Sequence, residues 1–313
     1  MTGKFTKPAP VALFAYNRPD HLRRTVEALA KNDLASETRL IVFSDGNRSE
    51  ADARAVAEVR KYLAGASSFE SVTVHERPRN FGLADSIVDG VTSTMELYER
   101  VIVLEDDILT SPVFLSYMND ALERYANEQK VMHITGYMFD IDWKGLPETF
   151  FMRQSSCLGW ATWKRAWKHF HRNGADYINR FTPVDIHRFN LDGAYDYWSQ
   201  LLANYQGTMK TWAVFWYACV FSKGGLCLHP RTSLVEHIGN DGSGTNCGSS
   251  QVSHRTTPAS VGPIRFFPEL IEEHPEAISR VQQSLSHLFG KDSHRRNSLR
   301  RLVKRISGLV LHR

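Results

Sequence analysis

The chain lacks several patterns that would place it in a familiar class of protein. It contains no GxxxxGK[ST] and no GxGxxG sequence, which argues against P-loop kinases and NTPases and against dehydrogenases with a glycine-rich dinucleotide turn. No apolar run of about 18 residues occurs, and the first residues show no stretch typical of a signal peptide. The four cysteines form no CxxC pair, so we expect reduced thiols and a cytoplasmic protein.

Net charge is small as well. The 38 Lys and Arg residues exceed the 34 Asp and Glu residues by only +4, and eight of the basic residues lie in residues 291–313 with a single acid. The rest of the chain therefore has no basic surplus, and we expect no nucleic-acid-binding face.

Residues 291–313 are the strongly basic segment. Their apolar residues recur at helical spacing: Leu299, Leu302, Val303, Ile306, Leu309 and Val310. A basic amphipathic helix is typical of proteins that bind anionic membrane surfaces. The same pattern also fits a helix packed on its own domain or a contact with a partner protein. We expect a cytoplasmic protein that binds peripherally at the inner face of the membrane.

Strands and helices are expected to alternate over the first third of the chain. Continuous apolar runs predict strands at residues 11–16, 40–43, 72–75 and 101–104. Helical patterns follow the first three of these runs, with Leu22, Val26 and Leu29 on one side of the first helix and further helices at 50–64 and 83–98. This order predicts βαβ units, hence an α/β fold with a mostly parallel central sheet and helices on both faces.

Polar residues end these strands, at Tyr16-Asn17-Arg18, Ser44-Asp45-Gly46 and Glu105-Asp106-Asp107. Because ligands of open parallel sheets bind beyond the carboxyl ends of the strands, we expect the three clusters to share one crevice. Three adjacent carboxylates suit a hard divalent cation, Mg²⁺ or Mn²⁺, which commonly accompanies phosphate groups. The alternative is that the acids cap a helix that begins near Ser111.

Four blocks resemble the nucleotide-sugar-binding half of GT-A fold glycosyltransferases. They are VALFAYNRPDHLRRTVEAL, LIVFSDG, RNFGLADSIVDGV and VIVLEDDI, in this order. The resemblance covers about residues 9–250 and points to bacterial family-2-like enzymes and to animal N-acetylglucosaminyltransferases with an EDD metal motif. It implies a metal-dependent transfer of a hexosyl or N-acetylhexosaminyl group from a nucleotide-diphosphate sugar. The implied acceptor is a saccharide or lipid-linked glycan of bacterial surface polysaccharide synthesis.

The resemblance also implies roles for individual residues. Contacts to the nucleotide sugar are implied for Ala15, Tyr16, Asn17, Arg18, Asp45, Asn80, Gly82, Glu105 and Asp106. Within this set, the residues from Ala15 to Arg18 would surround the base and ribose, Asp45 would bind the nucleobase, and the loop of Asn80 and Gly82 would close over the nucleotide. Asp107 would contact the metal, while Glu105 and Asp106 would face the ribose and the sugar.

A tryptophan-rich segment lies farther along the chain. Gly159 and Trp160 resemble a block that lines the donor-sugar pocket of related transferases, where a flat aromatic surface suits the apolar face of a sugar. The alternative for Trp160 is core packing. Core packing is what we expect for Trp163 and Trp167, which are four residues apart on one predicted helix face.

A glycine-rich polar loop at residues 239–246 resembles the IG-x-DGSGT block that ends the catalytic domain of the bacterial enzymes. An ordinary surface turn is the alternative. His237 lies just before this loop, where GT-A enzymes often take a contact to the metal or diphosphate from a polar residue. A purely structural histidine would fit the sequence as well.

The catalytic base cannot be transferred by resemblance. In the EDD-type animal enzymes it is an aspartate in a tryptophan-flanked segment, whereas the nearest counterpart here, residues 211–216, contains no acid. An inverting transfer needs a carboxylate that takes the proton of the acceptor hydroxyl, and Asp241 and then Asp196 are the candidates. A retaining transfer needs no such base. The missing acid keeps open a second hypothesis, a non-catalytic module that binds a nucleotide sugar or glycan.

The expected organisation has three parts. Residues 1–250 form a catalytic domain with a nucleotide-sugar-binding half (1–110) and an acceptor-side half (111–250), which contains a buried helix from Trp212 to Phe221, a turn and two short strands. A helical extension (251–290) and the basic amphipathic tail (291–313) follow.

Overall fold

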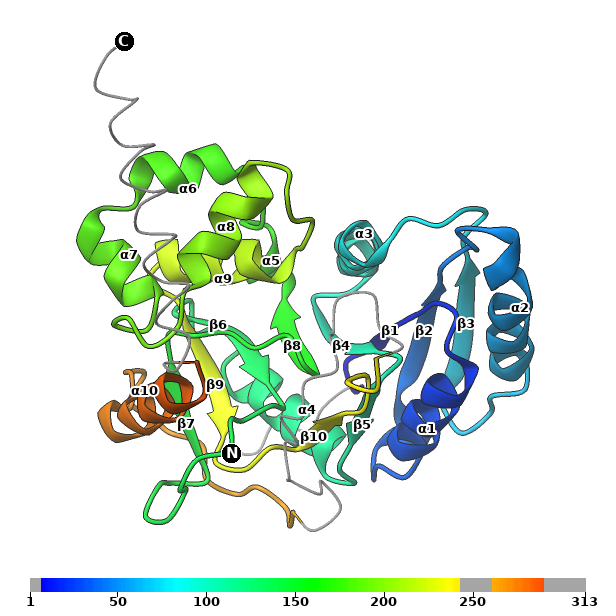
Figure 1. Cartoon of the computed structure of the whole chain (residues 1–313). Helices are drawn as coiled ribbons and strands as arrows, with labels where there is room; N and C mark the ends of the chain where they lie inside the picture. The colour runs from blue at the N-terminus through cyan, green and yellow to red at the C-terminus, as the bar shows by residue number, and fades with distance from the viewer. Residues whose placement is uncertain (1–6, 243–260, 290–313) are drawn as a thin grey trace.

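The computed structural model describes residues 7–242 and 261–289 (Figure 1). A central eight-stranded sheet has the order β3-β2-β1-β4-β8-β6-β9-β7. Its strands are β1 (Val11–Ala15), β2 (Arg39–Ser44), β3 (Ser71–Glu76), β4 (Arg100–Glu105), β6 (Val131–Thr135), β7 (Thr149–Met152), β8 (Trp160–Trp163) and β9 (Leu226–Pro230). Strands β3, β2, β1 and β4 are mutually parallel, whereas β8 runs antiparallel to both β4 and β6. The expected α/β fold with a mostly parallel sheet is confirmed.

Helices cover both faces of this sheet. They are α1 (Pro19–Ala30), α2 (Glu50–Ala64), α3 (Leu83–Leu97), α4 (Phe114–Arg124), α5 (Lys164–Trp167), α6 (Gly174–Arg180), α7 (Pro183–Phe189), α8 (Tyr197–Tyr205), α9 (Ala213–Ser222) and α10 (Pro275–Phe289), with a 3₁₀ turn at Ala35–Glu37. Along β1, Val11 and Leu13 pack with α1, α2 and α4, while Ala12 and Phe14 pack with α3 and α9. The alternation of β-strand side chains thus supplies two separate apolar layers.

A second, two-stranded sheet lies beside the end of β4. It pairs β5 (Ile108–Thr110) antiparallel with β10 (Val235–His237), and His237 lies opposite Ile108. Because β5 follows the acidic cluster directly and α4 begins only at Phe114, the acids do not cap that helix. The helix-capping alternative is therefore wrong.

Helices α5 to α9 lie over the half of the sheet that contains β8, β6 and β9 (Figure 1). Their buried aromatic side chains form an aromatic layer on the sheet. The buried helix expected from Trp212 to Phe221 corresponds to α9. The prediction that Trp163 shares a helix face with Trp167 is wrong, because Trp163 ends β8 and pairs with Arg100 of β4. Both side chains are nevertheless buried, as expected.

The last described segment returns to the sheet. Helix α10 buries Ala277, Val281 and Leu285 against Phe150 and Met152 of β7. The basic segment 291–313, residues 243–260 and Cys247 lie outside the described residues. The three remaining cysteines, at positions 157, 219 and 227, form no disulfide. Within residues 7–242 and 261–289, no helix is long and apolar enough to span a membrane.

Candidate active site

A cavity of about 450 Å³ opens at the carboxyl ends of β1, β2 and β4 and at the first turn of α3. Its walls include all the predicted nucleotide and metal contacts that precede Gly159 in the sequence: Ala15, Tyr16, Asn17, Arg18, Asp45, Asn80, Gly82, Glu105, Asp106 and Asp107. His237 lines it as well. The expectation that the polar ends of these strands share one crevice is confirmed, as parallel-strand topology requires.

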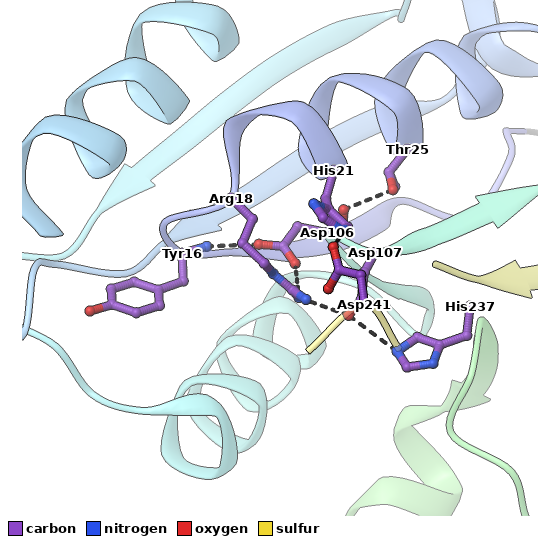
Figure 2. Close-up of polar contacts among 8 residues, drawn as sticks. All are labelled: Tyr16, Arg18, His21, Thr25, Asp106, Asp107, His237 and Asp241. Carbon is purple, nitrogen blue, oxygen red and sulfur yellow. Dashed lines mark hydrogen bonds and ion pairs between the residues drawn. The ribbon is translucent and has the colours of Figure 1, made fainter. Parts of the chain in front are cut away.

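Arg18 neutralises two of the three acids. Its Nη2 donates to Asp106 Oδ1 at 2.5 Å and to Asp107 Oδ2 at 2.7 Å (Figure 2). The side chains of Asp106 and Asp107 are only 4% and 6% exposed, so the guanidinium is their main positive partner in a region poor in water. Arg18 is held in place because it is the N-cap residue of α1, which starts at Pro19.

The three carboxyl groups differ electrostatically. Burial raises the pKa of Glu105 to about 8, with the neighbouring charges of Asp107 and Asp106 acting in the same direction. Burial also raises the pKa of Asp106, although Arg18 opposes it. For Asp107, burial is outweighed by the contacts to His237 and Arg18, and its pKa is lowered. Asp107 is therefore the acid that the surroundings hold in its charged form.

His237 reaches Asp107 across 130 positions of sequence. Its Nε2 lies 3.2 Å from Asp107 Oδ2 (Figure 2). The β5–β10 pairing fixes this approach, and the N–H of Ile238 adds a 2.9 Å hydrogen bond to the Asp107 carbonyl. The carboxylate and the imidazole therefore sit on adjacent strand ends of one small sheet.

Gly239 completes a cradle behind these groups. A Cβ atom at this position would lie 2.2 Å from Asp107 Oδ2, 2.9 Å from His237 Nε2 and 3.0 Å from Arg18 Nη1. Asp107 Oδ1 and Arg18 Nη1 are buried and have no hydrogen-bond partner among the described residues. Buried polar atoms are normally paired, so an unpaired carboxylate oxygen in a cavity is suited to an external ligand.

The protein ligands present fit a divalent cation whose remaining coordination positions are filled by water and substrate. Within the described part of the chain, no group of three or more His, Cys, Asp or Glu side chains is arranged to hold a metal. Asp107 and His237 supply two ligands. Mg²⁺ commonly binds proteins through only one or two carboxylates and takes its remaining ligands from water and substrate phosphates.

Asp45 stabilises a loop rather than standing free in the cavity. Its Oδ1 accepts the N–H groups of Gly46 (3.0 Å) and Phe81 (2.8 Å), and its Oδ2 accepts that of Gly82 (3.0 Å). Asn80 adds a 2.9 Å hydrogen bond from Nδ2 to the Gly46 carbonyl. These bonds fix the loop that leads into α3 against the end of β2, so the wall of the cavity is preformed.

Two residues at the site, Asp52 and Lys210, were not predicted from the sequence. Asp52 accepts hydrogen bonds from the Tyr16 hydroxyl (2.7 Å) and from Asn17 Nδ2 (3.0 Å), although its position in a Ser49–Asp52 capping box marks only a helix start. Lys210 lines the cavity from the segment between α8 and α9.

The structure does not bring the predicted tryptophan into the cavity, and this prediction is wrong. The side chain of Trp160 is 1% exposed, and its ring stacks on His133 and Trp212 at 5.3 Å between centroids. Its position in β8 directs it into the aromatic layer below α9, where its apolar surface is removed from water. The Gly159 carbonyl forms a backbone hydrogen bond, accepting the N–H of Gly136 at 2.7 Å.

The two candidate bases have different surroundings. Asp241 Oδ2 lies 3.2 Å from His21 Nε2 (Figure 2). Asp196 instead caps α8, since its carboxylate accepts the N–H (3.1 Å) and the hydroxyl (2.7 Å) of Ser199. Neither Asp196 nor Asp241 is among the described residues that line the cavity. Asp241 lies two positions beyond Gly239, the residue next to Asp107 and His237, whereas Asp196 belongs to the cap of α8.

Fold and site together define an α/β protein with a ligand cavity at the carboxyl ends of parallel strands. Residues 11–195, more than half of the chain, match the family described as Glycosyl transferase family 2. The chain therefore belongs to glycosyl transferase family 2. This family is named for glycosyl transfer, which is also the reaction that the sequence resemblance predicts.

Several solved structures are similar to this chain. They include a mannosyltransferase from Pyrobaculum calidifontis in complex with GDP-Man and Mn²⁺ (TM-score 0.42, 11% identity, 70% of this chain and 69% of that chain). The galactosyltransferase LgtC, in complex with donor and acceptor sugar analogs, has a TM-score of 0.34 and 13% identity over 69% of this chain and 72% of that chain. A cytidylyltransferase from Leptospira borgpetersenii has a TM-score of 0.32 and 11% identity over 56% and 66%. No curated protein sequence is a significant match.

Proposed function

We propose that this chain is a metal-dependent glycosyltransferase that moves a sugar from a nucleotide-diphosphate sugar to a saccharide acceptor. One observation carries the proposal: Arg18, Asp107 and His237 converge over Gly239 at the carboxyl ends of the parallel strands (Figure 2). A cavity of about 450 Å³ at that edge lies within the range of small-molecule sites.

Asp107 and His237 would hold the cation, Mn²⁺ or Mg²⁺. A bound divalent cation stabilises the charge that develops on a departing nucleoside diphosphate. The chain's own contribution is to keep Asp107 ionised through Arg18 and His237. A second contribution is the fixed loop at Asn80 and Gly82, which orients the nucleotide against the end of β2.

Asp241 is the proposed base of an inverting transfer. Its side chain is 48% exposed, so an acceptor hydroxyl can reach it from solvent, and His21 holds one of its oxygens. It lies two residues beyond Gly239, close to the proposed metal ligands. In such a reaction its carboxylate takes the proton from the acceptor hydroxyl as the oxygen attacks the sugar.

The proposed acceptor is a saccharide or a lipid-linked glycan of a bacterial surface polysaccharide. This part of the proposal rests on the resemblance of the four sequence blocks to bacterial enzymes. The proposed location at the inner face of the membrane rests on residues 291–313, which lie outside the described part of the chain.

A donor panel tests the proposal. The protein is incubated with Mn²⁺ or Mg²⁺ and each common UDP-, GDP-, dTDP- or CMP-sugar, and nucleotide release is followed together with thermal stability. We expect one donor to be hydrolysed slowly and this release to stop with EDTA. Stabilisation by a nucleotide with no release, even with a glycan extract as acceptor, would instead support a binding module.

Two variants assign the roles. Asp107→Asn should abolish metal-dependent release, whereas the exposed carboxylate Asp33, changed to Asn, serves as a control that should behave like the wild type. Asp241→Asn should retain metal-dependent stabilisation by the donor but lose transfer. Normal turnover of the Asp107 variant would rule out the metal assignment.

A further inference from the structure

Lys210, in the segment between α8 and α9, lines the cavity together with the acidic cluster at the end of β4. Its Nζ lies 2.6 Å from Asp85 Oδ2, in the first turn of α3. The side chain of Lys210 is 69% exposed, so this ion pair lies in water at the rim of the cavity. Exposed ion pairs of this kind contribute little stability, and a better anionic partner can replace one of their members.

Asp85 does not depend on Lys210. Its other carboxylate oxygen, Oδ1, lies 2.7 Å from Arg172 Nη1. If Lys210 turns away, the carboxylate keeps its contact with Arg172 and remains paired. The arrangement therefore allows the ammonium group to leave Asp85 at small cost, unlike Arg18, which is held by two buried carboxylates.

The loop that carries Lys210 is anchored at both ends. Residues 206–210 are exposed, and Trp212 immediately beyond is buried. Asn204 closes the loop by accepting the Thr211 N–H (2.7 Å) and donating to the Thr211 hydroxyl (3.0 Å). The backbone position of Lys210 is thus fixed, while its flexible four-carbon stem is free to redirect the charge.

Lys210 is one of three Lys and Arg residues in the cavity wall. The acidic residues of the wall are Asp45, Glu105, Asp106 and Asp107, and its Lys and Arg residues are Arg18, Arg48 and Lys210. Arg18 already serves two carboxylates. Lys210 approaches from another element, at the first turn of α3, where backbone N–H groups also favour anions.

We propose that the ammonium group of Lys210 leaves its ion pair with Asp85 and binds the diphosphate of the bound donor instead. The α8–α9 segment would thereby respond to occupation of the cavity. This inference rests on the proposed function, because it takes a nucleoside diphosphate as the ligand. It makes Asp85 a competitor of the substrate, so that removing Asp85 and removing Lys210 should have opposite effects.

Calorimetric titration with UDP and GDP in the presence of Mn²⁺ tests this, with UMP and GMP as ligands that lack the second phosphate. Lys210→Gln should weaken binding of the preferred diphosphate about tenfold and that of its monophosphate less than threefold, and Lys210→Arg should restore most of the loss. Asp85→Asn should strengthen diphosphate binding a few-fold. Arg172→Gln, which removes the other partner of Asp85 and lies outside the cavity wall, should weaken diphosphate binding less than Lys210→Gln does.

The outcomes separate this inference from the proposed function. If Lys210→Gln binds the diphosphate like the wild type while Asp107→Asn does not, the Lys210 assignment alone is overturned. Equal weakening in the Lys210, Asp85 and Arg172 variants would show that the ion pairs only hold α3 and the helical layer together, which also overturns it. Absence of diphosphate binding by the wild-type protein would overturn both proposals. Thermal unfolding of each variant establishes that it is folded.

Discussion

Gly239 provides the sharpest test of the site, because it has no room for a side chain. The Cβ of an alanine would lie 2.2 Å from Asp107 Oδ2, whereas ordinary contact begins at 3.4 Å. The carboxylate oxygen, or the backbone behind it, must therefore shift by about 1.2 Å, which is the difference between these two distances. Such a shift disturbs the 2.7 Å contact with Arg18 and the 3.2 Å contact with His237 together.

The magnitude follows from the displacement. A misplacement of about 1 Å at a reacting centre can cost about 10²-fold in rate, which corresponds to about 2.7 kcal/mol of transition-state stabilisation. Overpacking itself destabilises a fold by about 1–3 kcal/mol. For Gly239→Ala we expect kcat/KM to fall about 10²-fold, while the melting temperature falls by only a few degrees.

The assay compares Gly239→Ala with Gly262→Ala, since a Cβ at position 262 meets nothing within 4 Å. Metal-dependent nucleotide release from the donor is measured along with the stabilisation by Mn²⁺ and nucleotide. The control should behave like the wild type in both. A Gly239→Ala protein that retains wild-type kcat/KM and metal response would refute the view that Asp107 and His237 form the reacting end of the cavity.

Two further predictions concern stability and pH. Arg153 is buried and donates to Asp192 Oδ2 (2.5 Å) and to Glu273, so Arg153→Ala should lower the free energy of unfolding in urea by about 3 kcal/mol, and wild-type stability would contradict this. Burial lowers the pKa of His133 to about 3 and that of His229 to about 4, so the unfolded state binds more protons than the native state below pH 6.5. Stability should therefore fall as the pH drops from 6.5 toward 4, by about 1.4 kcal/mol per pH unit for each histidine. The slope should lessen in His229→Asn, and an identical slope in that variant would refute the assignment.

Hydrogen bonding selects one neutral tautomer of His133, whose pKa burial lowers. Its Nε2 faces the Ser156 carbonyl at 2.8 Å, and that oxygen can only accept, so Nε2 carries the hydrogen. Its Nδ1 accepts the indole N–H of Trp216 at 3.0 Å. A second proton on the ring would have to occupy Nδ1 and oppose that N–H, in the buried interior. The neutral tautomer is therefore built into the aromatic layer.

The sequence predicts the sheet side of the molecule well, because local signals determine it. Continuous apolar runs give β1 to β4, helical periodicity gives α1 to α3, and parallel topology then brings the polar strand ends together. The contact between Asp107 and His237 depends on a different feature. Strands β5 and β10 have three residues each, too few for a periodic pattern, and their pairing joins distant parts of the chain.

The tryptophan-rich part of the chain shows the limits of composition as a guide. A dense group of tryptophans fits a sugar platform and an aromatic core equally well, and only the pairing of β8 with both β4 and β6 turns Trp160 inward. Lys210 carries no pattern at all, since lysines occur on most exposed loops. Its position is defined by the closed Asn204–Thr211 loop, a feature of tertiary structure.

The two aspartates at the end of β4, Asp106 and Asp107, differ in how completely the fold pairs their oxygens. Asp106 is satisfied within the fold, because its oxygens accept from Arg18 Nη2 and from the Tyr16 N–H at 3.1 Å, and its carbonyl accepts from the Thr25 hydroxyl at 2.9 Å. Asp107 shares the same guanidinium but keeps one buried oxygen, Oδ1, unpaired among the described residues. If charge balance were the only purpose of Arg18, one acid beside it would suffice and no buried oxygen would be left without a partner. The cation proposed above would supply a positive charge to this oxygen, and the unpaired oxygen is the physical reason for proposing Asp107 rather than its neighbour as the ligand.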